Sequence, residues 1–278
     1  FGLTVVDECH HISSEVFCRS LFQLVTKFTL GLSATMQRKD GLTKVFKMFL
    51  GEIVYSEKRE NTDNVLVKSI EYNVDDEEYN DLITDYRGNP MFSSMITKLC
   101  KYTRRSEFII KVLTDELVLN PTQQILILAH NKSILNYFEE SIKHKNIANG
   151  SVGYYIGGMK APALKESEGK IIILATYAMA SEALDIKSLT TLFMITPKTD
   201  ITQSVGRILR MKHSQPLIVD IVDQHEIFQN QWKKRKAFYH KNKYKIIHTN
   251  NEKYKLNDWE NIDAKERQTK IKTGKCLI

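Results

Sequence analysis

The chain has 278 residues, enough for two domains of ordinary size, and its 42% hydrophobic and 26% charged residues exclude a disordered or fibrous protein. No apolar run approaches the roughly 20 residues that cross a bilayer, so we expect no membrane partner. The formal net charge of +7 suits a polyanion such as nucleic acid, although charge alone does not identify one.

The first residues read as part of a buried strand. They contain no basic segment of a signal peptide, so we expect the chain to begin inside a domain. Leu3–Val6 and Thr29–Leu32 are the apolar strands of this part, and they are too few to close a sheet. We therefore expect residues 1–55 to be the last part of a first domain.

The next part, from residue 56 to 248, is expected to be a linker and a second domain. Val65–Val74 reads as a strand, and Asp75 or Asp76 could cap a helix after it. Apolar residues at helical spacing extend this helix and would share its buried face. They are Tyr79, Leu82, Ile83 and Tyr86.

From residue 104 onward, predicted strands and helices alternate. Further helices are expected over 104–119, around Leu135, Phe138 and Ile142, and over 161–168. The strands are expected at 125–129, 152–155, 171–174, 191–195 and 217–222. Strands that are apolar on both faces and alternate with helices predict a parallel α/β sheet. Residues 249–278 read as a polar, peripheral tail.

The cysteines show no metal-binding pattern. Cys9, Cys18, Cys100 and Cys276 include no pair at CxxC spacing, which argues against a zinc site and against a disulfide framework. Reduced thiols fit an intracellular, reducing compartment such as the cytoplasm or nucleus.

Two polar strings follow the first two strands. In Asp7-Glu8-Cys9-His10, one carboxylate could hold Mg²⁺ on a triphosphate while a second orients the attacking water. In Ser33-Ala34-Thr35, the hydroxyls could hydrogen-bond the acidic pair. Each string alone is equally compatible with a solvated turn or a helix cap.

Two further strings lie in the second domain. Thr176 follows a strand and could contact a sugar-phosphate backbone, while Asp185 in Ser181–Asp185 could bind a ribose hydroxyl. In Gln203–Arg210, Arg207 and Arg210 share a helix face and could act as arginine fingers on a γ-phosphate. Gly206 lets a ligand or backbone approach closely. A surface helix with solvated arginines would explain the same pair.

Taken together, the four strings in this order resemble motifs II, III, V and VI of superfamily 2 helicases. The segments Leu30–Leu42, Tyr154–Lys160 and Gln203–Arg210 are more particular. They look like the DExH helicases of phages and large DNA viruses, in the branch that includes XPB and UvsW. The resemblance implies RecA-like parallel sheets flanked by helices: the C-terminal part of a first RecA-like domain, then a complete second one. It adds a viral replication site to the expected locations.

The resemblance also assigns roles to residues. Asp7 would coordinate Mg²⁺, Glu8 would position or deprotonate the water, and His10, Ser33 and Thr35 would couple the nucleotide to the nucleic acid. Asp185, Gln203, Gly206, Arg207 and Arg210 would serve the ATP site. His130, Asn131, Lys160 and Thr176 would contact the nucleic-acid backbone.

The resemblance therefore implies an ATP-dependent helicase or translocase that acts on nucleic acid, with DNA favoured over RNA. An RNA helicase and a binding module without ATPase activity remain as alternatives. The phosphate loop GxxxxGK[ST] is absent from the 278 residues, so the segment alone is predicted to be inactive. Ala183 also stands where the family usually has Gly.

The segment 231–245 has two interpretations. Its lysines, arginine and aromatic residues could form a nucleic-acid surface that combines charge with stacking. Alternatively, it is a terminal helix that packs Phe228, Trp232 and Tyr239 against the second domain. The helical spacing of these rings favours packing.

Overall fold

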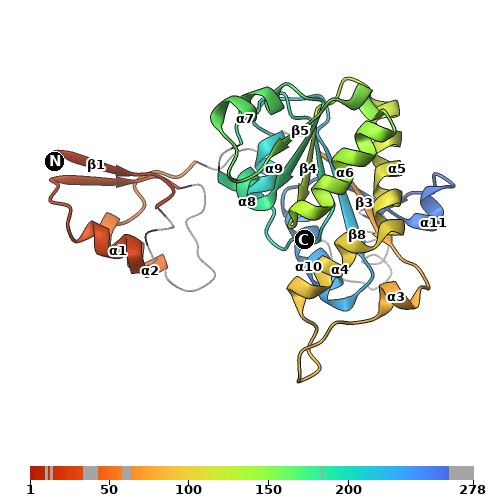
Figure 1. Ribbon diagram of the computed structural model, residues 1–278. Coiled ribbons are helices and arrows are strands. Elements are labelled where there is room, and N and C mark those ends of the chain that lie inside the picture. The colour runs from red at the N-terminus through yellow and green to blue at the C-terminus, as the bar shows by residue number, and fades with distance from the viewer. Residues whose placement is uncertain (10–11, 13–14, 34–42, 58–63, 183, 263–278) are drawn as a thin grey trace, which may run out of the picture. The chain divides into compact units, whose positions relative to one another are not determined.

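The structure, a computed structural model, describes residues 1–9, 12, 15–33, 43–57, 64–182 and 184–262. The chain folds as two compact units, Phe1–Glu60 and Asn61–Ile278 (Figure 1). Within the described ranges, no helix combines the length and apolar character that a membrane-spanning segment requires.

The first unit contains a short parallel pair of strands and two helices. They are β1 (Leu3–Val6), α1 (Glu15–Leu21), β2 (Phe28–Gly31) and α2 (Thr43–Leu50). The strands pair in parallel from Leu3 with Phe28 to Val6 with Gly31. On the covered side, Val6, Cys9 and Ile12 form a small core.

The second unit contains an eight-stranded sheet in the order β10-β9-β3-β8-β7-β4-β6-β5. All its pairings are parallel except that of β10 with β9. The strands are β3 (Leu66–Tyr72), β4 (Ile125–Ala129), β5 (Val152–Tyr155), β6 (Ile172–Thr176), β7 (Thr191–Met194), β8 (Leu217–Asp223), β9 (Lys245–Asn250) and β10 (Glu260–Asn261). Because neighbouring strands are parallel, their carboxyl ends lie along one edge, where α/β sheets place ligands.

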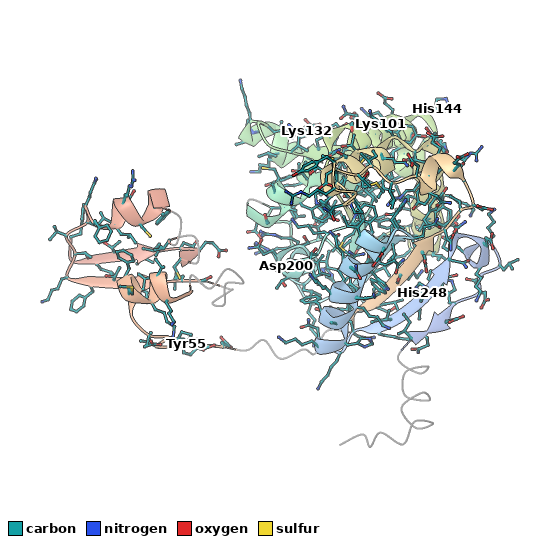
Figure 2. All side chains as sticks on the ribbon, turned by 90° about the horizontal axis from the view of Figure 1, so that it is seen from below. Tyr55, Lys101, Lys132, His144, Asp200 and His248 are labelled. Atoms are coloured by element: carbon teal, nitrogen blue, oxygen red, sulfur yellow. The ribbon has the colours of Figure 1, made fainter. Side chains whose placement is uncertain are left out.

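Helices cover both faces of this sheet. One face packs against α8 (Tyr177–Glu182), α9 (Thr202–Ile208) and α10 (Glu226–Lys241), and the other against α5 (Thr103–Leu119) and α6 (Lys132–His144). In Figure 2, Lys132 and His144 mark the ends of α6, while Asp200 lies just before α9 on the other face. Side chains of β4 alternate between the two cores, which explains why all five of its residues are buried. The smaller helices are α3 (Glu77–Asn80), α4 (Phe92–Lys101), α7 (Ala161–Glu168), α11 (Asn251–Tyr254) and the 3₁₀ helix η2 (Ile147–Gly150).

Two buried aspartates of β8 are each held by an arginine from a different helical layer. Asp220 and Asp223 are three positions apart, so their side chains lie on opposite faces of the sheet. The Nε and Nη2 atoms of Arg105, on α5, donate to Asp223 at 2.6 and 2.8 Å. Arg235, on α10, donates from Nε to Asp220 at 2.8 Å. Both pairs are almost fully buried.

The expected helix over 75–86 is wrong beyond its first turn. Asp76 does cap α3, since its side chain accepts the Tyr79 N–H at 3.4 Å, but the helix ends at Asn80. Asp81 has φ −56° and ψ 136°, an extended conformation that cannot continue a helix. The chain then forms a turn that leads into α4, so Tyr86 is exposed instead of buried.

The polar tail expected from residue 249 differs from the structure over 249–262. Here β9 pairs in parallel with β3, and β10 closes the sheet edge. Tyr254 and Trp259 pack their rings together at 5.8 Å and lie against the core on the α5 face. Two aromatic residues in a polar segment supply enough apolar area to hold this end of the chain against the domain.

We predict that Arg105→Met destabilises the chain by about 3–5 kcal/mol, because Asp223 would remain as a buried, unpaired charge. The double variant Arg105→Met with Asp223→Leu should lose less than the sum of the two single variants. Chemical denaturation measures these free energies of unfolding. The matched control is Arg104→Gln. The Arg104 side chain is exposed, so its ion pair with Asp76 should contribute little to stability. Additive losses, or an equal loss for Arg104→Gln, would contradict a buried coupled pair.

Candidate functional site

In the first unit, the ends of β1 and β2 bring two predicted strings side by side. The backbone N–H of Leu32 donates to Val6 O at 2.9 Å, and that of Cys9 donates to Leu32 O at 2.9 Å. Asp7 and Glu8, which follow β1, therefore lie beside the residues that connect β2 to Ser33. A Cβ added at Gly31 would meet Leu50 Cδ1 at 2.4 Å and Cys9 Sγ at 3.1 Å, so a larger residue here would force these side chains to shift.

The acidic pair is exposed, and its backbone is unusual. Glu8 has φ +46°, in the left-handed region that residues other than glycine rarely adopt. The Asp7 carboxylate accepts the Glu8 N–H at 2.8 Å, which stabilises this turn. Such strain is found at functional sites, where surrounding contacts impose it. His10 and Thr35 lie outside the described residues, as does Ala183.

In the second unit, His130 forms the centre of a polar cluster at the carboxyl edge. Its backbone N–H donates to Thr196 Oγ1 at 3.0 Å, and its Nδ1 lies 2.9 Å from the same oxygen. The Tyr177 hydroxyl donates to Thr196 O at 2.7 Å, and its ring lies 4.8 Å from the imidazole. The ammonium of Lys198 lies over the Tyr177 ring at 5.4 Å. Three strand ends, those of β4, β6 and β7, thus meet at one point.

The environment of His130 favours its neutral form. Burial, with a smaller contribution from the nearby Lys198 charge, lowers the pKa of His130 to about 4. At neutral pH the imidazole is therefore uncharged and can offer hydrogen bonds but no ion pair. A contact from this side chain to phosphate would not depend on its charge.

The other predicted nucleic-acid residues lie on the same edge of the sheet. Asn131 donates from Nδ2 to Thr97 Oγ1 of α4 at 3.4 Å, which ties the edge to that helix. Thr176 ends β6 and pairs in register with Ala129 of β4. Lys160 is exposed and precedes α7. The structure places Thr176 at the end of a parallel strand and the other three residues after one, as their sequence positions indicated.

The two predicted arginine fingers differ in their surroundings. Arg207 is nearly buried, and its guanidinium donates to Leu184 O at 2.7 Å and to Ser181 O. Arg210 forms an ion pair with Asp185, and both side chains remain partly exposed. Gln203 is exposed and Gly206 half-buried on α9. Ser181, Leu184 and Asp185 are therefore joined to Arg207 and Arg210 in one connected site, a link that sequence reasoning did not predict. The expected helix face shared by the two arginines is wrong, because α9 ends at Ile208 and Arg210 lies beyond it.

Sequence reasoning also missed the partners of His130. Thr196 and Lys198 directly follow the predicted strand 191–195, so the strand-end argument that selected His130 and Thr176 applied to them equally. Tyr177 directly follows Thr176 at the end of a predicted strand, so the same argument covers it. A systematic survey of every predicted strand end would have found all three.

The packing interpretation of the basic helix is confirmed. Phe228, Trp232 and Tyr239 of α10 are buried. Arg235 is 1% exposed and pairs with Asp220, so it belongs to the core and not to a nucleic-acid surface. The exposed lysines of the helix remain solvated.

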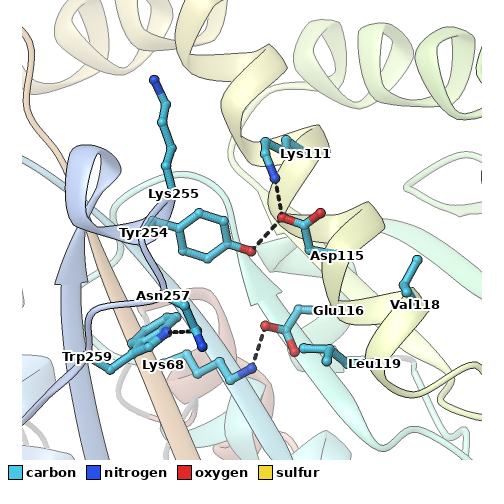
Figure 3. Close-up of a pocket in the computed structure, with 10 residues that line it drawn as sticks. All are labelled: Lys68, Lys111, Asp115, Glu116, Val118, Leu119, Tyr254, Lys255, Asn257 and Trp259. Atoms are coloured by element: carbon cyan, nitrogen blue, oxygen red, sulfur yellow. Dashed lines mark hydrogen bonds and ion pairs between the residues drawn. The ribbon is translucent and has the colours of Figure 1, made fainter.

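A pocket of about 450 Å³ lies away from the carboxyl edge, between α5, β3 and the segment 254–259 (Figure 3). Four of its five charged lining residues are paired with one another, and Lys255 is the fifth. Lys68 contacts Glu116 at 2.6 Å, and Lys111 contacts Asp115 at 2.6 Å. The Tyr254 hydroxyl donates to Asp115 at 3.0 Å, which joins the segment 254–259 to α5.

No protein-family model matches the chain. It is 36% identical over 251 residues to a protein of Acanthamoeba polyphaga mimivirus provisionally named an ATP-dependent RNA helicase, covering 88% of this chain and 48% of that protein. An African swine fever virus protein with the same provisional name is 26% identical over 268 residues, covering 89% and 52%. A protein of Escherichia phage T5, provisionally named a helicase, is 25% identical over 258 residues, covering 89% and 54%. The chain thus spans about half the length of these relatives.

Two solved structures resemble the fold. S. cerevisiae Dbp5 bound to RNA and ADP–BeF3 matches with a TM-score of 0.58 and 12% identity, over 92% of this chain and 61% of that one. Phage T4 UvsW matches with a TM-score of 0.51 and 20% identity, over 90% and 54%. At these identities the likeness shows the fold alone, and it confirms the expected α/β class with a mostly parallel sheet flanked by helices.

We predict that replacing the two arginines by lysine has unequal effects on stability. Arg207→Lys should destabilise the chain by about 1–3 kcal/mol, because its buried carbonyl partners lose donors. Arg210→Lys should cost at most about 1 kcal/mol, because the pair with Asp185 is partly solvated. Thermal unfolding of both variants measures the difference. Equal losses would show that the burial of Arg207 does not determine its contribution.

We predict that His130 makes the chain less stable as the pH falls from about 6.5 to about 4. In this window the unfolded chain protonates its histidine at the ordinary pKa, while the folded chain does not. Above about 6.5 both states are neutral, so this loss is absent. His130→Gln cannot titrate and should lose less stability across the window, as measured by melting curves at each pH. Parallel curves for both proteins would mean that the pKa of His130 is not lowered.

Proposed function

We propose that the chain is part of a superfamily 2 helicase, an ATP-dependent motor that moves along nucleic acid, and the viral relatives provisionally named helicases support this. The observation that supports this best is the placement of the motif residues. In each unit, they follow the carboxyl ends of parallel strands. This is the edge at which α/β sheets bind ligands and at which relative motion of two domains can act on a bound strand.

For ATP, we propose that the acidic pair is the catalytic centre. Asp7 offers carboxylate oxygens, the ligands that Mg²⁺ prefers, and such an ion would neutralise phosphate charge. Glu8 would orient the attacking water and accept its proton. The ATP-dependent names of the viral relatives support this reaction.

In the second unit, the arginines are the proposed phosphate-binding and supporting groups. Arg210 is partly exposed, so its guanidinium could exchange the Asp185 carboxylate for a phosphate. Arg207 would act mainly by holding the segment 181–184 in place through its backbone contacts. Asp185, released from Arg210, would then be available for a ribose hydroxyl.

For nucleic acid, we propose that the edge formed by His130, Asn131, Lys160 and Thr176 grips the backbone. Because the proposed contact is to the sugar-phosphate backbone, it would be independent of base sequence. DNA is the proposed strand, on the resemblance to the UvsW branch. RNA is the second candidate, which the provisional names of the mimivirus and African swine fever virus relatives favour. A binding module without hydrolysis fits less well, because the DExH string and both arginines are intact.

We predict that in the whole protein, Lys160→Ala with Thr176→Ala reduces both strand binding and strand-stimulated ATP hydrolysis. The matched double variant Lys233→Gln with Lys234→Gln should lower the salt dependence of binding and leave stimulation intact, because exposed lysines on α10 raise occupancy without reaching the edge. The measurement is steady-state ATPase with single-stranded DNA, duplex DNA and RNA at several salt concentrations. Glu8→Gln supplies the baseline, since it should bind ATP without turnover.

The opposite pattern would overturn the assignment. If the α10 variant lost stimulation and the edge variant kept it, the basic helix would be the true contact. Turnover by Glu8→Gln within a few-fold of wild type would remove Glu8 from the catalytic role. If RNA stimulated ATP hydrolysis and DNA did not, RNA would replace DNA as the proposed strand.

A further inference from the structure

The turn between α3 and α4 forms a small, closed hairpin. Thr84 and Pro90 form an antiparallel bridge. Asp85 donates its N–H to Asn89 O at 2.9 Å. Gly88 has φ +81°, which permits the reversal of the chain. In Figure 1 this hairpin projects from the second unit between α3 and α4.

The Asp85 carboxylate organises the hairpin from inside. It accepts the backbone N–H groups of Arg87 at 2.8 Å and Asn89 at 2.9 Å, and the Asn89 side-chain amide at 3.3 Å. These hydrogen bonds lower the pKa of Asp85, and the bond from the Asn89 backbone N–H has the largest effect. A turn with this many internal hydrogen bonds holds its shape before any partner arrives, which reduces the entropy lost on binding.

The tip of the hairpin carries an aromatic ring and a cation side by side. The Tyr86 side chain is 87% exposed. The guanidinium carbon of Arg87 lies 5.0 Å from the centroid of that ring. Among the described residues, no carboxylate forms an ion pair with Arg87. The tip therefore presents a flat apolar surface and a guanidinium without an ion-pair partner among the described residues.

The hairpin is joined to the proposed nucleic-acid edge through α4. Its second arm leads directly into Phe92, whose ring lies 5.9 Å from that of His130. One helical turn further along, Thr97 accepts the Asn131 side chain. The base of the hairpin is fixed too, because Lys98 of α4 donates to Asp81 O. A strand that lies on the edge at His130 would pass near this rigid projection.

We propose that the hairpin 84–90 contacts an unstacked base of the bound strand, with Tyr86 stacking on the base and Arg87 attracting the adjacent phosphate. An exposed aromatic ring beside a guanidinium is the combination that single-stranded nucleic acid binds, since every base offers a π face. A duplex hides those faces, so the contact selects single-stranded segments. This inference rests on the proposed function, because the backbone grip at His130 and Thr176 must deliver the strand.

The test uses two strands of equal length: an oligonucleotide that contains 2-aminopurine, and an abasic deoxyribose-phosphate strand. Tyr86→Ala should weaken binding of the first by about 5- to 100-fold and of the second by less than about twofold. It should also abolish the quenching of 2-aminopurine that stacking causes. Tyr86→Phe should restore both. Val118→Ala is the matched control, because its exposed side chain lies in the last turn of α5, beside the pocket of Figure 3.

The outcomes separate this inference from the proposed function. Thr176→Ala should weaken both strands equally, since it changes a backbone contact. If wild type binds both strands and Tyr86→Ala changes neither affinity nor quenching, the hairpin contact is wrong while the edge stands, and a protein partner becomes the better occupant. If wild type binds neither strand, the proposed edge is wrong and the hairpin contact falls with it.

Discussion

The second unit depends on two buried ion pairs that hold β8 between its helical layers. Removing four charged groups from water is costly, and it is offset only because each pair is close and further hydrogen-bonded. Tyr79 adds a hydrogen bond to Asp223 at 2.7 Å, and Tyr239 adds one to Asp220 at 2.8 Å. Each arginine thereby links a helix on one face to a central strand, and the register of both layers is set by polar contacts that apolar packing alone would not specify.

The same arginines also hold the loop after β7. Arg105 donates to Ile195 O at 2.9 Å, and Arg235 donates to Lys198 O at 2.7 Å. Thr196 lies between these two anchor points and supplies the oxygen that positions His130. The buried core and the candidate nucleic-acid edge are therefore coupled. A change in the packing of α5 or α10 would therefore move the loop and the His130 side chain that it positions.

This chain contains two groups of arginines: buried ones that join secondary-structure elements, and accessible ones near the proposed sites. Arg105, Arg207 and Arg235 are buried and bind carboxylates or carbonyls, so they add nothing to an electrostatic surface. Arg87 and Arg210 are the arginines that remain accessible near the proposed sites. Net charge is thus a poor guide to nucleic-acid contact here, because much of the guanidinium charge is used to join elements. The two accessible arginines lie near the strand ends and on the hairpin.

The sequence by itself determined the strands and the edge. Apolar runs such as Ile125–Ala129 can be satisfied only by burial on both faces, and a parallel sheet then puts His130 and Thr176 on one edge. Only the tertiary structure decided which polar groups are used for packing. Arg235 looked like its exposed lysine neighbours, and Tyr86 fitted the helical spacing. Arg235 is buried because folding places Asp220 beside it, and Tyr86 is exposed because α3 ends at Asn80 and the chain turns away. Burial of a polar or aromatic side chain is thus set by the partners that folding supplies.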